Sequence, residues 1–384
     1  MRKPRDWGQP CPNPDCSLYN RMHKGNVSAI STDMPQSGKR RILHCTQCEQ
    51  SFSETRDTVF FDLRTPEEKV MMALKMLLVR VDLAGICFVL GVTEETVLAW
   101  LRRAAQQAEA INHHLLRALP VTQVQLDEMW NFIARKHACE TDTTGESLPN
   151  GEDGRQWVWV SFAPECRLMI AAVVGPRTLD MAKEVVAVTK ARVAGIPAFF
   201  SDGFTSYLAA LIAAFHVVTP FARTGKRGRP RKPLCEPHPD LIYGQLVKQK
   251  KQGKLLTLST RLVLGAERLT QRGLTISTAL VERVNLTLRQ ALAPFVRKTY
   301  SFCKDRERLR QRVVFFQAFY NVARPHMSLR QPLPLHERQR HGAIHPCWRE
   351  RTPAMAAGLT DHLWTFRELL TVKFEPLDSQ SING

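Results

Sequence analysis

The chain has 384 residues, and 44% of them are hydrophobic, so it is long enough for two or three folded domains and is not a mainly disordered protein. Its formal net charge is +18 and its sequence pI is near 9.8, an excess that indicates a polyanionic partner and says little about fold. Nucleic acid is the polyanion that we expect first.

The first 60 residues are expected to form a small metal-binding module. Residues 1–10 are polar and charged, which predicts no secretory signal and hence a cytoplasmic protein. Cysteines of a cytoplasmic protein are usually metal ligands or core residues and do not form disulfides. Tetrahedral zinc takes four thiolates, which two closely spaced pairs can supply to a module too small for its own core. Pairs with this zinc-ribbon spacing are Cys11 with Cys16 and Cys45 with Cys48; chance clustering is the alternative.

Residues 61–119 have the pattern of a small helical domain. Apolar residues recur at helical spacing in three stretches, and a short turn with Gly91 separates the second stretch from the third. Thr93, after that turn, is a typical N-cap residue. The order resembles a helix-turn-helix, whose last helix enters a major groove of DNA, and an ordinary helical bundle is the alternative.

From residue 120 the pattern changes from helices to strands. Three successive strands are expected within 124–175, followed by a helix and then a short strand at 198–201. This order is that of the ribonuclease-H-like α/β fold. Residues 140–155 are rich in Asp, Glu, Thr and Gly, and we expect a long exposed hairpin loop there.

Residues 203–222 carry no charge and are long enough to span a membrane. The stretch nevertheless follows a turn, contains Ser, Thr, Tyr and His, and has Pro220 near its end, so a helix followed by a strand fits it better. Since no signal is expected at the amino terminus either, we predict a cytoplasmic protein.

Three acidic residues have the spacing of a divalent-metal site. Asp127 lies in the first strand, Asp202 follows the short strand, and Glu282 lies on a helical stretch, so distant segments could bring them together. Magnesium prefers oxygen ligands, and substrate phosphate oxygens complete its shell. Two such ions about 4 Å apart support in-line displacement at phosphorus. The pattern therefore predicts phosphodiester chemistry on nucleic acid.

Local periodicity separates these carboxylates from their neighbours. Alternation along a strand places Glu128 on the face opposite Asp127, so Glu128 is the less expected ligand. On the helix, Glu282, Asn285 and Arg289 share a face beside the buried apolar stripe. For Glu282, a solvated position on the helix surface is the alternative.

Positive charge is concentrated on both sides of Glu282. Residues 221–254 carry ten Lys and Arg residues against two acidic ones, and residues 283–330 carry eleven against two. Within the first segment, residues 226–233 resemble an AT-hook, whose Arg-Gly-Arg-Pro core lies along a narrow A·T-rich minor groove. A basic loop that contacts phosphates, or solvated helical faces, are the alternatives.

Several motifs together resemble those of one protein family. Besides the two cysteine pairs, they are Leu126-Asp-Glu-Met-Trp130, Phe200-Ser-Asp-Gly203, Val281-Glu-Arg-Val-Asn285 with Arg289, and Tyr320-Asn-Val-Ala-Arg-Pro-His326. Over nearly its whole length the chain is similar to bacterial insertion-sequence transposases of the DDE class, and in particular to the IS-one family.

The resemblance implies an α+β multidomain protein. Its parts are a zinc ribbon at 1–60, a helix-turn-helix domain at 61–119, a ribonuclease-H-like catalytic domain at 120–330 with a basic insertion at about 221–254, and a carboxy-terminal tail at 331–384. Within the tail, residues 352–364 are similar to the tail of the family; their aromatic and apolar content suggests packing or assembly, and no chemistry is assigned to them.

The resemblance also implies that Asp127, Asp202 and Glu282 are catalytic residues that bind magnesium or manganese. The substrate is double-stranded DNA, namely the terminal inverted repeats of the element, and cleavage leaves a 3' hydroxyl that attacks target DNA. A homodimer or larger assembly near the bacterial nucleoid is expected, with no membrane and no small-molecule substrate. The residues expected to contact DNA are Arg102, Arg103, Lys226, Arg227, Arg229, Arg231, Lys232, Arg283, Asn285 and Arg289.

Two other functions fit parts of the sequence. One is a DNA-binding regulator whose carboxylate domain is an inactive scaffold, and the other is a structure-selective nuclease that cuts DNA without joining it. The intact Asp, Asp and Glu argue against the regulator, and the separate DNA-reading modules argue against the nuclease.

Overall fold

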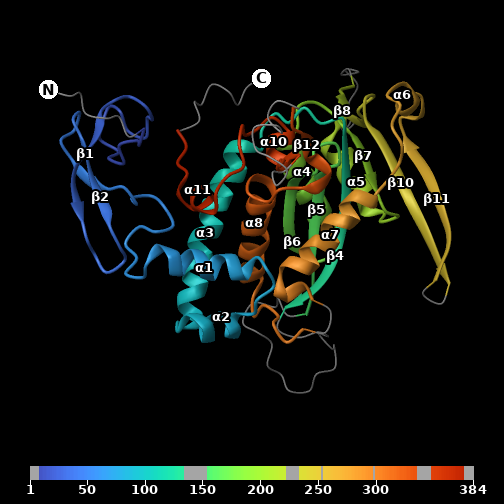
Figure 1. Ribbon diagram of the computed structural model, residues 1–384. Coiled ribbons are helices and arrows are strands. Elements are labelled where there is room, and N and C mark those ends of the chain that lie inside the picture. Colours follow the sequence, from blue (N-terminus) through green and yellow to red (C-terminus); the bar gives the residue numbers. More distant parts are fainter. Residues whose placement is uncertain are drawn as a thin grey trace, which may run out of the picture.

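The computed structural model describes residues 8–133, 154–221, 233–251, 254–296, 299–334 and 347–375. Figure 1 shows a small sheet near the amino terminus, a group of helices beside it, and a larger sheet covered by helices. No single helix in these ranges is long and apolar enough to cross a membrane, although α2 (Leu83–Leu90) and α3 (Glu94–Leu115) reach that length and composition as a pair bent by 109°.

The amino-terminal module is a three-stranded antiparallel sheet with the order β1-β2-β3. Its core consists of cysteines rather than of a layer of apolar side chains: Cys11, Cys16 and Cys45 are buried together, with Cys48 packed against them. A module of this size has too little apolar area for a core of its own. The strands are β1 (Val27–Asp33), β2 (Arg40–Cys45) and β3 (Ser51–Ser53).

The three predicted helices are present as α1 (Glu67–Leu77), α2 and α3. Thr93 caps α3 by accepting a hydrogen bond from the N–H of Thr96, and Gly91 ends α2 in the left-handed conformation, at φ 58°. The last helix, α3, packs against α8 (Arg306–Val322).

One hydrophobic core joins these helices to the rest of the chain. Trp100 and Leu101 of α3 belong to the same buried cluster as Val313 and Phe316 of α8. The helical segment thus shares a core with the larger sheet, and the boundary at residue 119 stays a prediction.

The larger sheet has six strands in the order β11-β10-β7-β4-β5-β6. Strands β4, β5 and β6 form an antiparallel meander, whereas β7 lies parallel to both β4 and β10. This mixed sheet is consistent with the ribonuclease-H-like domain that the resemblance implies. The strands are β4 (Gln123–Ile133), β5 (Gly154–Ala163), β6 (Leu168–Gly175), β7 (Ala198–Ser201), β10 (Ile242–Lys251) and β11 (Lys254–Leu264).

Helices cover both faces of this sheet, and strand alternation decides which side chains meet them. On β5, Val158 and Val160 belong to the core with α7 (Ala279–Ala291) and α8, while Trp159 between them belongs to the core with α4 (Leu179–Arg192) and α5 (Ser206–Ala214). The sheet is therefore the middle layer of three (Figure 1).

The remaining elements are short. Strands β8 and β9 form a separate two-stranded ribbon, and the AT-hook-like residues between them, 226–232, lie outside the described residues, as does most of the predicted loop at 140–155. These elements are β8 (His216–Thr219), β9 (Leu234–Pro237), α6 (Ala266–Gln271), the 3-10 turns Ala293–Phe295 and Met327–Leu329, β12 (Gln331–Pro332), β13 (Trp348–Arg349), α10 (Pro353–Ala356) and α11 (Phe366–Thr371).

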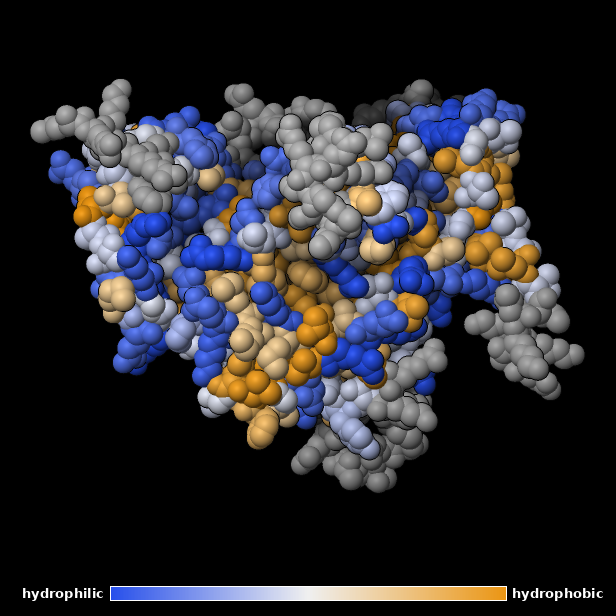
Figure 2. Space-filling model, in the orientation of Figure 1, coloured by the Kyte–Doolittle hydropathy of each residue, from blue (hydrophilic) through white to orange (hydrophobic). Residues whose placement is uncertain are grey.

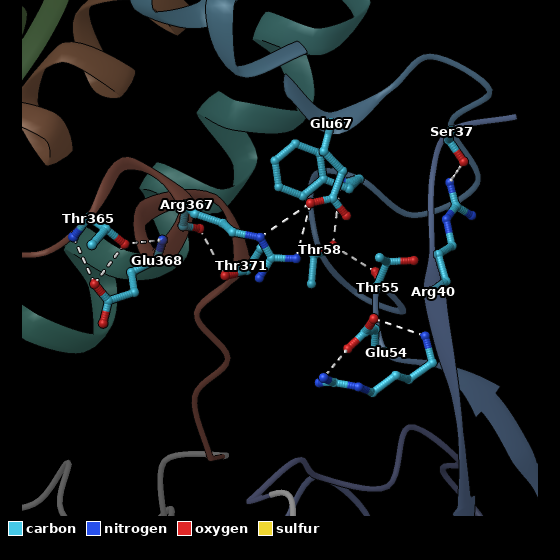
Figure 3. A network of polar contacts seen from close by, with 12 residues as sticks. Ser37, Arg40, Glu54, Thr55, Thr58, Glu67, Thr365, Arg367, Glu368 and Thr371 are labelled. Atoms are coloured by element: carbon cyan, nitrogen blue, oxygen red, sulfur yellow. Dashed lines mark hydrogen bonds and ion pairs between the residues drawn. The ribbon is translucent and has the colours of Figure 1, made fainter. Parts of the chain in front are cut away.

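The carboxy-terminal segment returns to the amino-terminal module. Arg367 of α11 forms an ion pair with Glu67 at the start of α1, at 3.0 Å (Figure 3). Beyond α11, the carbonyl oxygen of Phe374 accepts a hydrogen bond from the Asn20 side chain at 3.1 Å, and that of Val372 accepts one from Gln107 of α3 at 2.5 Å. Residues 367–374 thus connect the cysteine module to α1 and α3.

Helix α2 leaves an apolar surface exposed. Its composition is apolar all round, yet Ile86 is its one fully buried residue, and Phe88 is 88% exposed next to Val89. Figure 2 shows this apolar area on the lower part of the molecule, over α2. Helices that are apolar on every side are normally buried.

Candidate active site

The three predicted carboxylates line one cleft of about 560 Å³. Asp127 comes from the middle of β4, Asp202 from the residue after β7, and Glu282 from the first turn of α7. Parallel pairing of β4 with β7 places Leu126 opposite Ser201, so the two aspartates follow at the same level of the sheet. The cleft is also lined by Glu128, Met129, Gly203, Leu246, Val247, Lys248, Asn285 and Arg289.

Asp202 is held by the turn in which it lies. All four residues of β7 are buried, so the strand is fixed in the core up to Ser201. The chain then leaves the sheet, and the Asp202 carboxylate accepts a hydrogen bond from the backbone N–H of Phe204 at 3.0 Å. A side chain that bonds its own backbone two residues on is a local turn motif, and it leaves the second carboxylate oxygen to the cleft.

A residue of α7 holds the Asp127 carboxylate. Its Oδ2 accepts a hydrogen bond from the side-chain amide of Asn285 at 2.7 Å. Burial first, and then the nearby charges of Glu128, Asp202 and Glu282, together raise the pKa of Asp127 to about 7. Several carboxylates crowded in a partly buried cleft repel one another, and a divalent cation relieves that repulsion.

A metal ion fits the arrangement of the oxygens. One carboxylate oxygen from each of Asp127, Glu128 and Asp202 lies within 4.8 Å of the others. Oxygen ligands from carboxylates are those that magnesium and manganese take, and the absence of His and Cys among these three disfavours zinc.

Glu128 differs from its two neighbours, because the protein already uses both of its oxygens. Arg177 donates two hydrogen bonds to Oε1, at 2.9 and 2.6 Å, and the Tyr207 hydroxyl donates to Oε2 at 3.0 Å. The side chain of Glu128 is 1% exposed, and burial raises its pKa while Arg177 opposes this. Its partners lie on the α5 side of the sheet, the face opposite Asp127 that strand alternation indicated.

Glu282 lies in the cleft but outside the close group of carboxylates. Its Oε1 accepts hydrogen bonds from Lys248 Nζ and from Thr278 Oγ1, the latter at 2.7 Å, and its side chain is 41% exposed. Sequence reasoning missed Lys248 as a residue of the site. The only signal for it was the basic composition of residues 221–254.

The residues predicted to contact DNA fall into three groups. Arg283 is exposed on α7, and Arg289 and Asn285 line the cleft. Arg102 is exposed on α3, whereas Arg103 donates hydrogen bonds to the backbone carbonyls of Val59 and Phe61 and so supports the fold. The AT-hook-like residues lie outside the described part of the chain; they are Lys226, Arg227, Arg229, Arg231 and Lys232.

The four paired cysteines form a second candidate metal site. Their sulfur atoms all lie within 4.8 Å of one another, with 3.6 Å between Cys11 and Cys48 and 3.9 Å between Cys16 and Cys45. Four sulfurs at about 2.3 Å from a tetrahedral zinc are about 3.8 Å apart, so these distances fit. Hydrogen bonds, the one from the backbone of Gln50 foremost, lower the pKa of Cys48 to about 7, which favours the thiolate that zinc requires, whereas burial raises the pKa of Cys11 and Cys16.

Comparisons with known proteins give little further information. No family model and no curated protein matches the chain. Among solved structures, the chain is similar to a Mos1 transposase paired-end complex with the left transposon end (14% identity, TM-score 0.16) and to the Mos1 strand transfer complex (15%, 0.15). The alignments cover 38% and 37% of this chain and 56% and 52% of those chains, about half their length.

Proposed function

We propose that this protein is a DNA transposase of the DDE class. The observation that carries the proposal is the convergence of Asp127, Asp202 and Glu282, from three distant segments, on one cleft. Carboxylates so placed match the needs of metal-assisted phosphoryl transfer. The sequence motifs support the finer assignment to the IS-one family, with the terminal inverted repeats of its own element as substrate.

Each side chain of the cleft has a role in this proposal. Asp127 and Asp202 hold the divalent metal, and Asn285 keeps the Asp127 carboxylate turned toward the cleft. Glu282 completes the ligand set from α7. Magnesium or manganese, when bound, polarises the reacting phosphate and its attacking and leaving oxygens. Lys248 and Arg289 stand at the same cleft, where their charges can contact the phosphates on either side of the cut.

The basic charge of the chain supports double-stranded DNA as the partner. In this proposal the cysteine module carries a structural zinc, the helix-turn-helix and the AT-hook-like segment bind the element's ends, and exposed Arg102 and Arg283 contact phosphates. Two ends must be paired before joining, so we propose a homodimer or larger assembly. The exposed apolar surface of α2, with Phe88, is a face that such an assembly can bury.

Strand cleavage and joining are the activities to measure. Purified protein with magnesium or manganese is given labelled DNA that carries the element's own end, and wild type is compared with Asp127→Asn and Glu282→Gln. Glu267→Gln on α6 is a matched control, because this carboxylate is exposed and outside the cleft. We expect nicking and joining to fall by roughly a hundredfold or more in the two cleft variants. DNA binding is retained, and the control behaves as wild type.

The two alternatives give different results in the same experiment. Wild-type protein that binds verified ends but never cuts them is a regulator, and the proposal is then wrong. Wild-type protein that cuts and never joins is a nuclease. Equal activity of wild type and Asp127→Asn would show that the carboxylate cleft takes no part in the reaction.

A further inference from the structure

We propose that Arg177 is a positioning residue for the metal site: through Glu128 and Phe204 it holds the segments of Asp127 and Asp202 at a fixed separation. Arg177 lies between β6 and α4 and does not line the cleft. The inference rests on the metal site of the proposed function, and it concerns the geometry of that site rather than the reaction.

The first contact of Arg177 is with the strand that carries Asp127. Its Nε and Nη2 donate to the same oxygen of Glu128, at 2.9 and 2.6 Å, and Tyr207 occupies the other oxygen. A buried carboxylate is stable when opposite charge and hydrogen bonds satisfy it completely, and its removal from such a pair is costly. Asp127 directly precedes Glu128 in β4. Holding the Glu128 side chain in place therefore also holds the backbone from which the Asp127 side chain extends.

The second contact is with the turn that carries Asp202. The guanidinium of Arg177 stacks over the ring of Phe204, at 4.3 Å from its centroid, and over that of Trp157, at 4.9 Å. The backbone N–H of Phe204 is the donor that holds the Asp202 carboxylate. The Phe204 ring also packs against Trp159 and Tyr207, with centroids 5.7 and 5.6 Å apart. Arg177 therefore closes a link between the two ligand segments from the α5 side of the sheet, and neither Arg177 nor Phe204 lines the cleft.

Lysine cannot replace arginine in this link. An ammonium group is a point charge, whereas the planar guanidinium donates two bonds to the carboxylate while it stacks on two rings. Magnesium and manganese need their oxygen ligands in near-ideal positions. Loss of a partner that orients ligands in this way typically costs 10- to 100-fold in metal affinity.

Direct metal binding tests the inference without DNA. Mn²⁺ binding is measured by titration calorimetry on the zinc-loaded full chain for wild type, Arg177→Lys, Phe204→Leu and Arg192→Lys. Arg192 is the matched control, because its guanidinium is largely buried on the same side of the sheet and bonds the carbonyl of Ile170, with no link to the cleft. We expect the Mn²⁺ dissociation constant to rise about 10- to 100-fold in Arg177→Lys. It rises less in Phe204→Leu and not at all in the control.

A second readout separates positioning from chemistry. The ligands themselves are intact in Arg177→Lys, so saturating Mn²⁺ is expected to restore most of its nicking activity, whereas Asp127→Asn stays inactive at any concentration. Unchanged Mn²⁺ affinity in both Arg177→Lys and Phe204→Leu overturns the inference, as does an equal loss in Arg192→Lys. If Mn²⁺ binding depends on Asp127 and on Arg177 but no DNA is cut, the inference stands and the proposed function fails. Mn²⁺ affinity that is unchanged in Asp127→Asn overturns both the inference and the proposed function.

Discussion

Asp127→Asn is expected to stabilise the metal-free protein while it removes activity. The side chain stays the same size, and its remaining oxygen can still accept the hydrogen bond from Asn285. The change removes one negative charge from a cleft that also contains Glu128, Asp202 and Glu282. Without a metal ion, burial first and then these neighbouring carboxylates make that charge unfavourable, and the pKa of Asp127 is raised from 3.8 to about 7.

The size and the pH dependence of the effect follow from this pKa. Between about pH 4 and pH 7 the folded protein keeps a proton on Asp127 that the unfolded chain has lost, so wild-type stability falls as pH rises through that window. The full difference corresponds to about 4 kcal/mol above pH 7. Because Asp127 is partly exposed, solvent screening reduces this, and we expect on the order of 2 kcal/mol.

Urea unfolding of the two proteins at pH 5 and pH 8, in a weak magnesium chelator that spares zinc, measures the effect. The Asn variant should be the more stable at pH 8, with a smaller advantage at pH 5. Magnesium should reverse the order at pH 8, since binding at a hundred times the dissociation constant adds about 2.7 kcal/mol to wild type only. Asp180→Asn, an exposed carboxylate on α4, is the control. A difference that does not change between pH 5 and pH 8, or a wild type that is more stable at pH 8 without metal, refutes the reasoning.

Four further substitutions test other parts of the structure. Cys45→Ser should abolish binding of one zinc ion per chain in native mass spectrometry and expose the amino-terminal module to trypsin, and retention of zinc would contradict the ribbon. Burial lowers the pKa of Lys373 to about 8, so between pH 8 and 10.5 the folded state binds fewer protons than the unfolded state. Lys373→Met should therefore raise the free energy of unfolding at pH 7 by up to about 3 kcal/mol. This gain in stability should shrink toward pH 10. Arg103→Ala should lower the free energy of unfolding by about 1–2 kcal/mol, because its hydrogen bonds to two backbone carbonyls are lost. Arg102→Ala should leave the free energy of unfolding unchanged, weaken DNA binding and reduce the salt dependence of that binding. The opposite pattern in thermal melts and binding titrations would contradict these roles.

Much of the local structure could be predicted from periodicity and turn chemistry. The strand Ala198–Ser201 has the predicted bounds, because four apolar or small residues between a proline and an aspartate leave few alternatives. Thr93 caps its helix as expected, since an N-cap depends on a hydrogen bond within three residues. The types of metal ligand and the pairing of the cysteines could also be predicted from the sequence. Spacing indicated Glu282 as the third carboxylate, and the family resemblance favoured it over a solvated position on the helix surface.

Contacts between segments far apart in the chain could not be predicted in this way. Periodicity assigned Glu128 to the face opposite Asp127 but did not name Arg177 or Tyr207 as the groups that neutralise it there. Likewise, Lys248 reaches Glu282 only because β10 pairs beside β7 at the mouth of the cleft. Arg103 has the sequence context of a DNA contact, and the fold gives its guanidinium two backbone carbonyls instead.

The sequence by itself determined which groups could perform the chemistry: oxygen ligands for a hard cation, sulfur ligands for zinc, and a surplus of positive charge for a polyanion. The tertiary structure decided which of these groups meet, and what surrounds each. Burial and the distance to the nearest opposite charge decide whether a carboxylate stays available to a metal, as we propose for Asp127, or is already satisfied by arginine, as Glu128 is. Both quantities depend on the packing of residues that are 49 to 158 positions apart in the sequence, and adjacent side chains in one strand can therefore have different roles.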